Sequence, residues 1–237
     1  MPEGIGAVVP AAGSGRRLGG RQVKALVSLA GQPLIVHTLK AFQATPAIRW
    51  IVVAAPPKSE DRLWTLVRRH HLTKVCAIVA GASSRAESVM KATAALPVQA
   101  RWVIIHDGAR PCVTRQLIAQ TLSAVRQCGA VACGLPASLT VKAVDAKRMV
   151  RLTLDREGLW FVQTPQAFRR DWFADALAHA DHRLEEFPDD AALCEWAGFP
   201  VRLIPGDPLN IKVTTKEDLL LAEAILRRRE MKGGERV

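Results

Sequence analysis

The chain has 237 residues, of which 49% are hydrophobic, and its 33 lysines and arginines outnumber its 22 acidic residues to give a net charge of +11. This length fits one large α/β domain, or a domain with one sizeable excursion. We expect a cytoplasmic protein, because no stretch approaches the ~20 apolar residues of a membrane span and residues 1–4 lack the features of a signal peptide. The basic excess points to polyanionic ligands, which include nucleotides, phosphorylated metabolites and nucleic acid.

Helix and strand patterns alternate along the first half of the chain. Pro33 suits the first position of a helix, Ser59 and Thr114 are placed to cap two others, and Ser84 with Glu87 has the spacing of a capping box. Apolar runs predict strands at residues 7–10, 50–54, 75–79, 102–105 and 130–132. The alternation predicts a Rossmann-like, mostly parallel sheet with helices on both faces.

The first strand leads into the sequence AVVPAAGSGRRL at residues 7–18, and Lys24 follows. Here a β-branched strand ends in a turn of small residues, and basic side chains follow the turn. Such a segment can bring backbone N–H groups and positive charge close to a polyphosphate. A dinucleotide-binding fingerprint would need a third glycine where Leu18 stands, and a Walker motif would need Gly-Lys-Ser/Thr. We interpret the segment as a nucleotide triphosphate cradle. The alternative is an ordinary tight turn followed by solvated arginines.

Three of the predicted strands end in small and charged residues. In parallel sheets, ligands bind beyond the carboxyl ends of the strands. This rule places residues 13–17, 81–88 and 107–110 along one rim. We therefore expect the ligand at that rim.

Residues 138–163 change to a period of two around a polar turn, which predicts a β-hairpin arm inserted in the domain. An isolated two-stranded hairpin is marginal in water, so we expect the arm to pack against the same arm of a second subunit. The alternative is an arm folded back on its own domain. Only a 25.8 kDa species in sedimentation at micromolar concentration would contradict the dimer.

The remainder of the chain returns to the α/β pattern. Helices are predicted at residues 171–179, 189–196 and 217–229, with Thr215 and Asp218 at the start of the last one, and a strand is predicted at residues 201–204 before a loop at 208–214. Five cysteines lack C-x-x-C spacing and neighbouring histidines, so we expect buried free thiols and no zinc site. Asp189 and Asp190 could hold a metal, but the acidic first turn of a helix explains them as well.

Taken together, the motifs carry a family resemblance over nearly the whole chain. They are PAAGSGRR at 10–17, Lys24, RAESV at 85–89, HDGARP at 106–111, DREGLW at 155–160, TPQ at 164–166 and NIKVT at 210–214. In this order they resemble the 2-C-methyl-D-erythritol 4-phosphate cytidylyltransferases of the non-mevalonate isoprenoid route. The resemblance implies one nucleotidyltransferase domain over residues 1–237, with residues 138–163 as its extended arm, acting as a homodimer on CTP and a phosphorylated polyol.

The resemblance also implies roles for individual residues. Arg17 and Lys24 look like the cations that hold the CTP phosphates, and Lys212 and Arg156, the latter reaching into the neighbouring subunit's site, look like those that position methylerythritol phosphate. Asp107 resembles the residue that faces the polyol, and it completes the predicted catalytic set. The residues expected to bind the nucleotide are Ala11, Ala12, Gly13, Ser14, Gly15, Gly81, Ala82, Arg85, Ser88 and Gly108. Those expected to bind the second substrate are Ala109, Arg110, Thr140 and Thr164.

The chemistry of this reaction fits the residues that the rim offers. A phosphate monoester nucleophile has its second pKa at ~6, so it needs no catalytic base near neutral pH, and no paired carboxylates or nucleophile triad stand at the rim. Relief of repulsion between two anions requires Lys, Arg, backbone N–H groups and Mg²⁺. We expect the Mg²⁺ to be held mainly by the CTP phosphates, with Asp107 as a possible helper.

Three departures from the family pattern bear on these expectations. Val23-Lys24-Ala25-Leu26 replaces the usual Pro-Lys-Gln-Tyr, so the closure of that loop should differ. Leu139 stands where Asp is common, which bears on the orientation of Thr140, and residues 83–84 are less acidic than usual. No departure removes a cation that the chemistry needs.

Two competing functions are open at this point. The first is a cytidylyltransferase of the same build that acts on ribitol 5-phosphate, since the arm residues select the polyol. Nucleic-acid binding is suggested by the net charge, but aromatic residues make up only 5% of the chain and do not interleave with basic ones as a stacking platform requires. We therefore expect no nucleic-acid or membrane partner.

Overall fold

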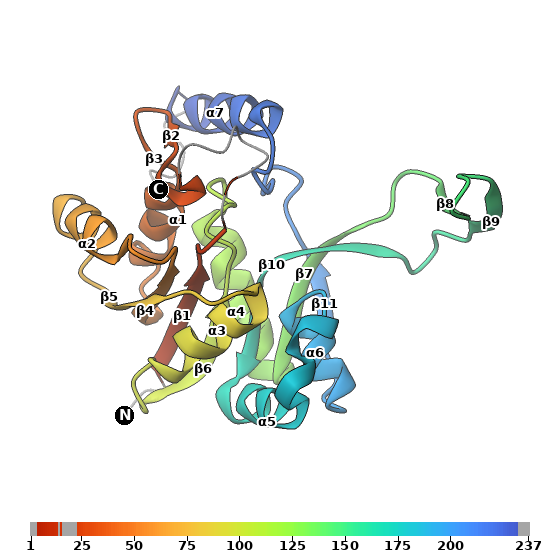
Figure 1. The fold of residues 1–237 in the computed structure, drawn as a ribbon, viewed down its shortest axis with the longest axis horizontal. Helices are drawn as coiled ribbons and strands as arrows, with labels where there is room; N and C mark the ends of the chain where they lie inside the picture. The colour runs from red at the N-terminus through yellow and green to blue at the C-terminus, as the bar shows by residue number, and fades with distance from the viewer. Residues whose placement is uncertain (1–3, 14, 16–22, 232–237) are drawn as a thin grey trace.

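The computed structural model describes residues 4–13, 15 and 23–231. Its centre is a seven-stranded sheet in the order β11-β7-β10-β6-β1-β4-β5 (Figure 1). In chain order, its strands are β1 (Gly4–Pro10), β4 (Ile48–Ala55), β5 (Val75–Ala80), β6 (Ala100–Ile105), β7 (Ala130–Pro136), β10 (Trp160–Arg169) and β11 (Arg202–Pro205). Two short hairpins pair β2 (Ser28–Leu29) with β3 (Gln32–Pro33), and β8 (Val141–Val144) with β9 (Val150–Leu154).

The central sheet is mostly parallel, as predicted, but β10 runs antiparallel to both of its neighbours, β6 and β7. The sequence pattern does not predict β10. Pro165 and the polar residues Gln163 and Gln166 interrupt the apolar alternation that marks a strand. The ladder between β10 and β7 has its irregularity at this same point, between Gln163 and Gln166.

Helices cover both faces of the sheet (Figure 1). One face carries α1 (Leu34–Gln43), α2 (Glu60–Arg69) and α4 (Arg115–Cys128), and the other carries α3 (Arg85–Ala94), α5 (Arg170–Ala180) and α6 (Asp190–Trp196). Ile5 and Val9 of β1 belong to the first core and Val8 to the second, as expected for a strand buried on both sides. The last helix, α7 (Lys216–Met231), packs in a third cluster with Leu29 and Leu34. Within the described ranges, no helix combines the length and apolar character needed to cross a membrane.

The helix starts agree with the predicted caps except at two positions. Ser84 and Glu87 form the capping box of α3, and the Thr114 hydroxyl accepts a hydrogen bond from the backbone of Leu117 at the start of α4. Ser59 occupies the cap position of α2, but its side chain makes no capping hydrogen bond, so that prediction is wrong. Pro33 precedes α1 in extended backbone instead of beginning it.

The arm is the most exposed part of the described chain. β8 and β9 form the predicted antiparallel hairpin, which projects away from the sheet at the far ends of β7 and β10 (Figure 1). It does not fold back on its own domain.

Among the cysteines, Cys112, Cys133 and Cys194 are buried as expected, whereas Cys76 is exposed, so that expectation is wrong for Cys76.

The cap of α4 gives a stability prediction. Thr114→Ala should lower the free energy of unfolding by about 1 kcal/mol, because the Leu117 N–H loses its partner at a helix start. Thr65→Ala is the matched control: Thr65 is exposed within α2 and its hydroxyl donates only to the Asp61 carbonyl. Denaturant unfolding of both variants checks the prediction, and equal stability of the two would contradict it.

Candidate functional site

A cavity of about 510 Å³ lies where the carboxyl ends of β1 and β6 meet the start of α3. Its volume is in the range of small-molecule sites. It is lined by Pro10, Ala11, Ala12, Gly13, Lys24, Ala25, Leu34, Ala82, Ser83, Ser84, Arg85, Ser88, Asp107, Gly108, Ala109 and Lys212. The three predicted strand ends therefore share one rim, and the loop that carries Lys212 joins them.

Small residues let three backbone segments approach one another at this rim. A Cβ on Gly81 would lie 2.3 Å from Cβ of Ala12 and 2.9 Å from the carbonyl oxygen of Ala55, so no larger residue fits there without a shift. The backbone N–H of Gly81 donates to that same Ala55 carbonyl at 2.7 Å. The Ser88 hydroxyl accepts the Ala82 N–H at 2.9 Å and so fixes the turn above α3.

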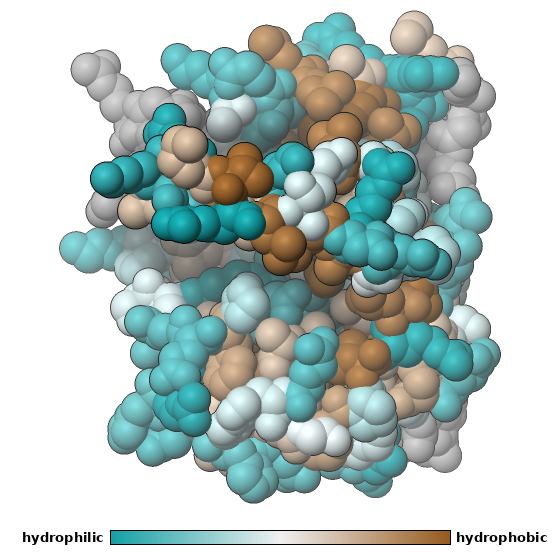
Figure 2. Space-filling view, turned by 90° about the vertical axis from the view of Figure 1, so that its right-hand side faces the viewer, coloured by the Kyte–Doolittle hydropathy of each residue, from teal (hydrophilic) through white to brown (hydrophobic). Residues whose placement is uncertain are grey.

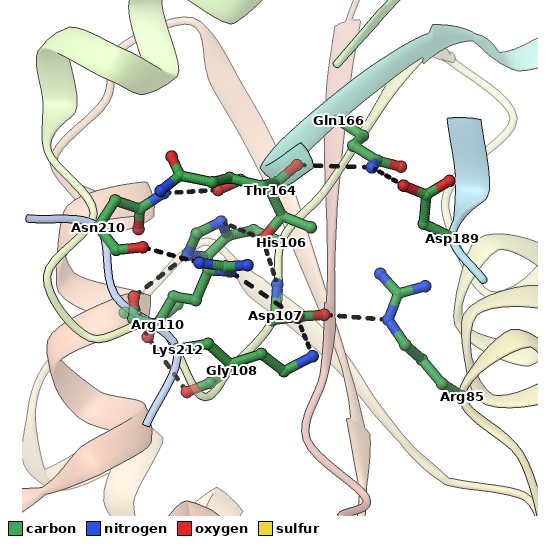
Figure 3. A network of polar contacts seen from close by, with 12 residues as sticks. Arg85, His106, Asp107, Gly108, Arg110, Thr164, Gln166, Asp189, Asn210 and Lys212 are labelled. Carbon is green, nitrogen blue, oxygen red and sulfur yellow. Dashed lines mark hydrogen bonds and ion pairs between the residues drawn. The ribbon is translucent and has the colours of Figure 1, made fainter. Parts of the chain in front are cut away.

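Asp107 is the acidic residue of the cavity lining, and basic groups surround it (Figure 3). Its Oδ1 accepts Nε of Arg85 at 3.0 Å, its Oδ2 lies 2.7 Å from Nζ of Lys212, and Nε of Arg110 is 3.9 Å away. Burial alone would raise the pKa of Asp107, but the positive charges of Arg85, Lys212 and Arg110 hold it well below its usual range. The carboxylate is therefore ionised at neutral pH.

A second set of hydrogen bonds holds the backbone of Asp107 (Figure 3). The Thr164 hydroxyl accepts the backbone N–H of Asp107 at 3.1 Å and lies 3.0 Å from Nδ1 of His106. His106 is completely buried, and its Nε2 lies 3.2 Å from the Arg110 carbonyl oxygen. Burial lowers the pKa of His106 to about 4, so the ring is neutral and donates from Nε2 while Thr164 donates to Nδ1. His106 is thus a hydrogen-bonding residue at the end of β6.

Asn210 connects the loop that carries Lys212 to Thr164 and Arg110, which lie behind the cavity. Its Nδ2 donates to the Thr164 carbonyl at 2.7 Å, and its own carbonyl accepts Nη1 of Arg110 at 2.8 Å. Both contacts lie two residues before Lys212, so they fix the loop that presents the ammonium group. The sequence motif at residues 210–214 marks this loop, but the pattern alone gives no role for Asn210.

Residues 23–26 depart from the family pattern, but Lys24 still lies at the cavity. Lys24 begins a single 3-10 turn, η2 (Lys24–Leu26), and lines the cavity. Ala25 and Leu26 are buried in the first core, and Val23 packs against that core. The apolar residues that replace Gln and Tyr of the family pattern therefore anchor the turn from below.

The structure gathers most of the predicted site residues but not all of them. Those that line the cavity are Ala11, Ala12, Gly13, Lys24, Ala82, Arg85, Ser88, Asp107, Gly108, Ala109 and Lys212. Gly81, Arg110 and Thr164 support it from behind, and Gly15 is not in the lining. Ser14 and Arg17 lie outside the described residues.

Two predicted residues are on the arm, away from the cavity of their own chain. Thr140 is exposed, and Arg156 donates from Nη1 to the Ser138 carbonyl at 2.7 Å within the arm. Neither lines the cavity. The structure therefore does not bring these two residues to the cavity of their own chain.

Sequence reasoning missed the use of Asp190 and Gln166. Asp190 Oδ2 accepts Nη2 of Arg85 at 2.8 Å, and Gln166 donates from Nε2 to Asp189 Oδ2 at 2.9 Å. The only signal was the acidic pair at the start of a predicted helix. In the described part of the chain, this pair is not joined by a third His, Cys, Asp or Glu side chain that could complete a metal site.

Comparison with known proteins places the chain in one family. The model of the 2-C-methyl-D-erythritol 4-phosphate cytidylyltransferase family matches residues 5–228. An enzyme of that name from Pelotomaculum thermopropionicum is 41% identical over 228 residues, which are 95% of each chain. Among solved structures, 4-diphosphocytidyl-2C-methyl-D-erythritol synthase from Anaerococcus prevotii is similar with a TM-score of 0.82 at 28% identity, covering 95% of this chain and 97% of its own. The cytidylyltransferase from Thermus thermophilus has a TM-score of 0.78 at 32% identity, covering 94% and 99%. The chain belongs to the 2-C-methyl-D-erythritol 4-phosphate cytidylyltransferase family.

Proposed function

We propose that this chain transfers the cytidylyl group of CTP to 2-C-methyl-D-erythritol 4-phosphate, releasing diphosphate, in isoprenoid precursor biosynthesis. Family membership makes it a nucleotidyltransferase. The observation that carries the proposal is the cavity itself, in which Lys24 and Lys212 face a rim of glycine and alanine backbone around the ionised Asp107. Cations and backbone N–H groups suit the transfer of a nucleotidyl group from a triphosphate to a phosphate monoester.

The reaction joins two anions, which repel each other. The lysines of the cavity lower this repulsion. An oxygen of the methylerythritol phosphate attacks the α-phosphorus of CTP, and the bond from that phosphorus to the diphosphate oxygen breaks. The attacking phosphate is ionised near neutral pH, because its second pKa is ~6. Lys24 supports charge on the triphosphate, and Lys212, held 2.7 Å from Asp107, is placed to meet the second phosphate. No proton has to be removed by the protein.

Pocket width is the proposed basis of base selection. Ala11, Ala12 and Ala82 line the cavity, and Gly81 packs behind Ala12 with no room for a Cβ. Backbone N–H and C=O groups can therefore come close to a base edge on a narrow platform. A pyrimidine fits such a platform, whereas a purine is wider.

We propose that Mg²⁺ enters with the nucleotide, as part of the substrate. Asp107 is the carboxylate that lines the cavity, and its two oxygens already accept Arg85 and Lys212. Among the described residues, no group of three His, Cys, Asp or Glu side chains is placed to hold a metal ion. Coordination by the CTP phosphates requires none.

The arm supports a homodimer. Sixteen large apolar side chains are exposed in the described chain, and eight of them lie in the 26 residues of the arm, 138–163. Figure 2 faces the side from which the arm projects and shows apolar groups among hydrophilic ones. A hairpin with both faces exposed is marginal by itself, and burial against a second copy would stabilise it. The same association would carry Arg156 and Thr140 to the partner's cavity.

The test of the proposed function is diphosphate release from CTP and Mg²⁺ with methylerythritol 4-phosphate. We expect release with this acceptor and none with ribitol 5-phosphate, which the family assignment does not favour. Replacing CTP by ATP or GTP should remove the activity if pocket width selects the base. A protein that releases diphosphate with neither acceptor would contradict the proposal.

The two described cavity lysines should carry much of the rate. Lys24→Ala and Lys212→Ala are each expected to lower kcat/KM by about 10²- to 10³-fold, because each removes a positive charge that meets the reacting phosphates. Circular dichroism should show an unchanged fold. Lys91→Ala, on the exposed side of α3, is the control and should keep the activity. Unchanged turnover in either cavity variant would refute its role.

Exchange of the arms can be tested by mixing two inactive variants. In a heterodimer of Arg156→Ala and Lys24→Ala subunits, one site has an intact cavity and receives an intact arm, while the other site has both defects. Random pairing in a coexpressed mixture should therefore restore about a quarter of the wild-type activity. If Arg156 acts in its own subunit, the mixture stays inactive.

A further inference from the structure

Asp190 is a buried carboxylate that lies behind the cavity and does not line it. It is the first residue of α6, and only 3% of its surface is exposed. Its Oδ2 accepts Nη2 of Arg85 at 2.8 Å, across 105 positions of sequence. A buried carboxylate destabilises a fold unless it is paired, so this ion pair is what allows Asp190 to be there.

The start of α6 is secured without the carboxylate of Asp190. The neighbouring Asp189 caps the helix by accepting the Ala192 N–H at 2.8 Å. Gln166 of β10 then ties the helix to the sheet. Its Nε2 donates to Asp189 Oδ2 at 2.9 Å (Figure 3). Its Oε1 accepts the Ala191 N–H, also at 2.9 Å. Capping and anchoring are thus done by other groups, and the ion pair of Asp190 serves a different purpose.

That purpose is visible in the geometry of Arg85. Its guanidinium donates from Nε to Asp107 Oδ1 at 3.0 Å and from Nη2 to Asp190 at 2.8 Å. The group is planar and rigid, so two carboxylates on different donors fix its orientation, whereas one carboxylate would let it turn. Asp107 in turn holds Lys212 by its other oxygen at 2.7 Å. A chain of ion pairs therefore runs from α6 through α3 and the end of β6 to the cavity.

We propose that Asp190 is a positioning residue for cytidylyl transfer, which fixes Arg85 and, through Asp107, the ammonium group of Lys212 at the cavity. The inference rests on the proposed function. Without the negative charge of Asp190, Asp107 alone faces Arg85, Lys212 and Arg110, and the arrangement of these cations relaxes. A small displacement of a positioned charge costs up to about 10²-fold in rate, so an effect of about 10- to 100-fold on kcat/KM is expected.

The experiment compares Asp190→Asn with Asp189→Ala in the full-length enzyme. Asp190→Asn keeps the shape of the side chain and removes its negative charge. The kcat/KM for methylerythritol phosphate should therefore fall about 10- to 100-fold. Asp189→Ala removes the cap and the Gln166 anchor but leaves Arg85 paired. It should lower Tm while kcat/KM stays close to that of the wild type. Asp190→Glu restores the charge and should recover part of the activity lost in Asp190→Asn.

A double-mutant cycle with Arg85→Met decides whether Asp190 acts through Arg85. In the Arg85→Met background, Asp190→Asn should cause no further loss of kcat/KM. Additive losses would overturn the proposal, and so would an Asp190→Asn enzyme with a lowered Tm and wild-type kinetics. If Asp190→Asn does not fold, the same cycle is run with Asp190→Glu. An inactive wild type would instead refute the proposed function, so it is measured first.

Discussion

One buried carboxylate, that of Asp107, determines where the cations of the cavity lie. An ion taken out of water destabilises a fold unless opposite charges and hydrogen bonds surround it. Asp107 meets this condition with Arg85 on one oxygen, Lys212 on the other, and the Thr164 hydroxyl on its backbone N–H. These partners come from three distant segments. The need to neutralise Asp107 thus brings together the parts of the chain that must face a polyphosphate.

The antiparallel strand β10 makes this arrangement possible. It lies between β6 and β7, so it brings the Thr164 hydroxyl to the backbone N–H of Asp107 and Gln166 to the start of α6. The same strand leads back from the arm. Support of the cavity floor and presentation of the arm are therefore properties of one continuous stretch of backbone.

Local signals in the sequence predict most of the fold and the strand ends that form the cavity, but not the contacts behind it. The capping box at Ser84 and Glu87 is a contact between near neighbours, so its spacing is readable, and it correctly marks the helix that begins at the cavity. The strand β10 was hidden because Pro165 and polar residues break its alternation, and only tertiary pairing makes it a strand. The partner of Asp190 lies 105 residues away, and no local pattern records such a contact.

The neutral ring of His106 has a consequence for the behaviour of the enzyme in acid. The pKa of this imidazole is about 4, and the pKa of Asp107 lies well below its usual range. Neither group therefore changes charge between mildly acidic and alkaline solution. These two groups therefore keep the same charge throughout that interval. The acceptor phosphate, whose second ionisation falls at ~6, does change. Acidity would then act on the rate through the ionisation of the substrate, while His106 and Asp107 keep their charges.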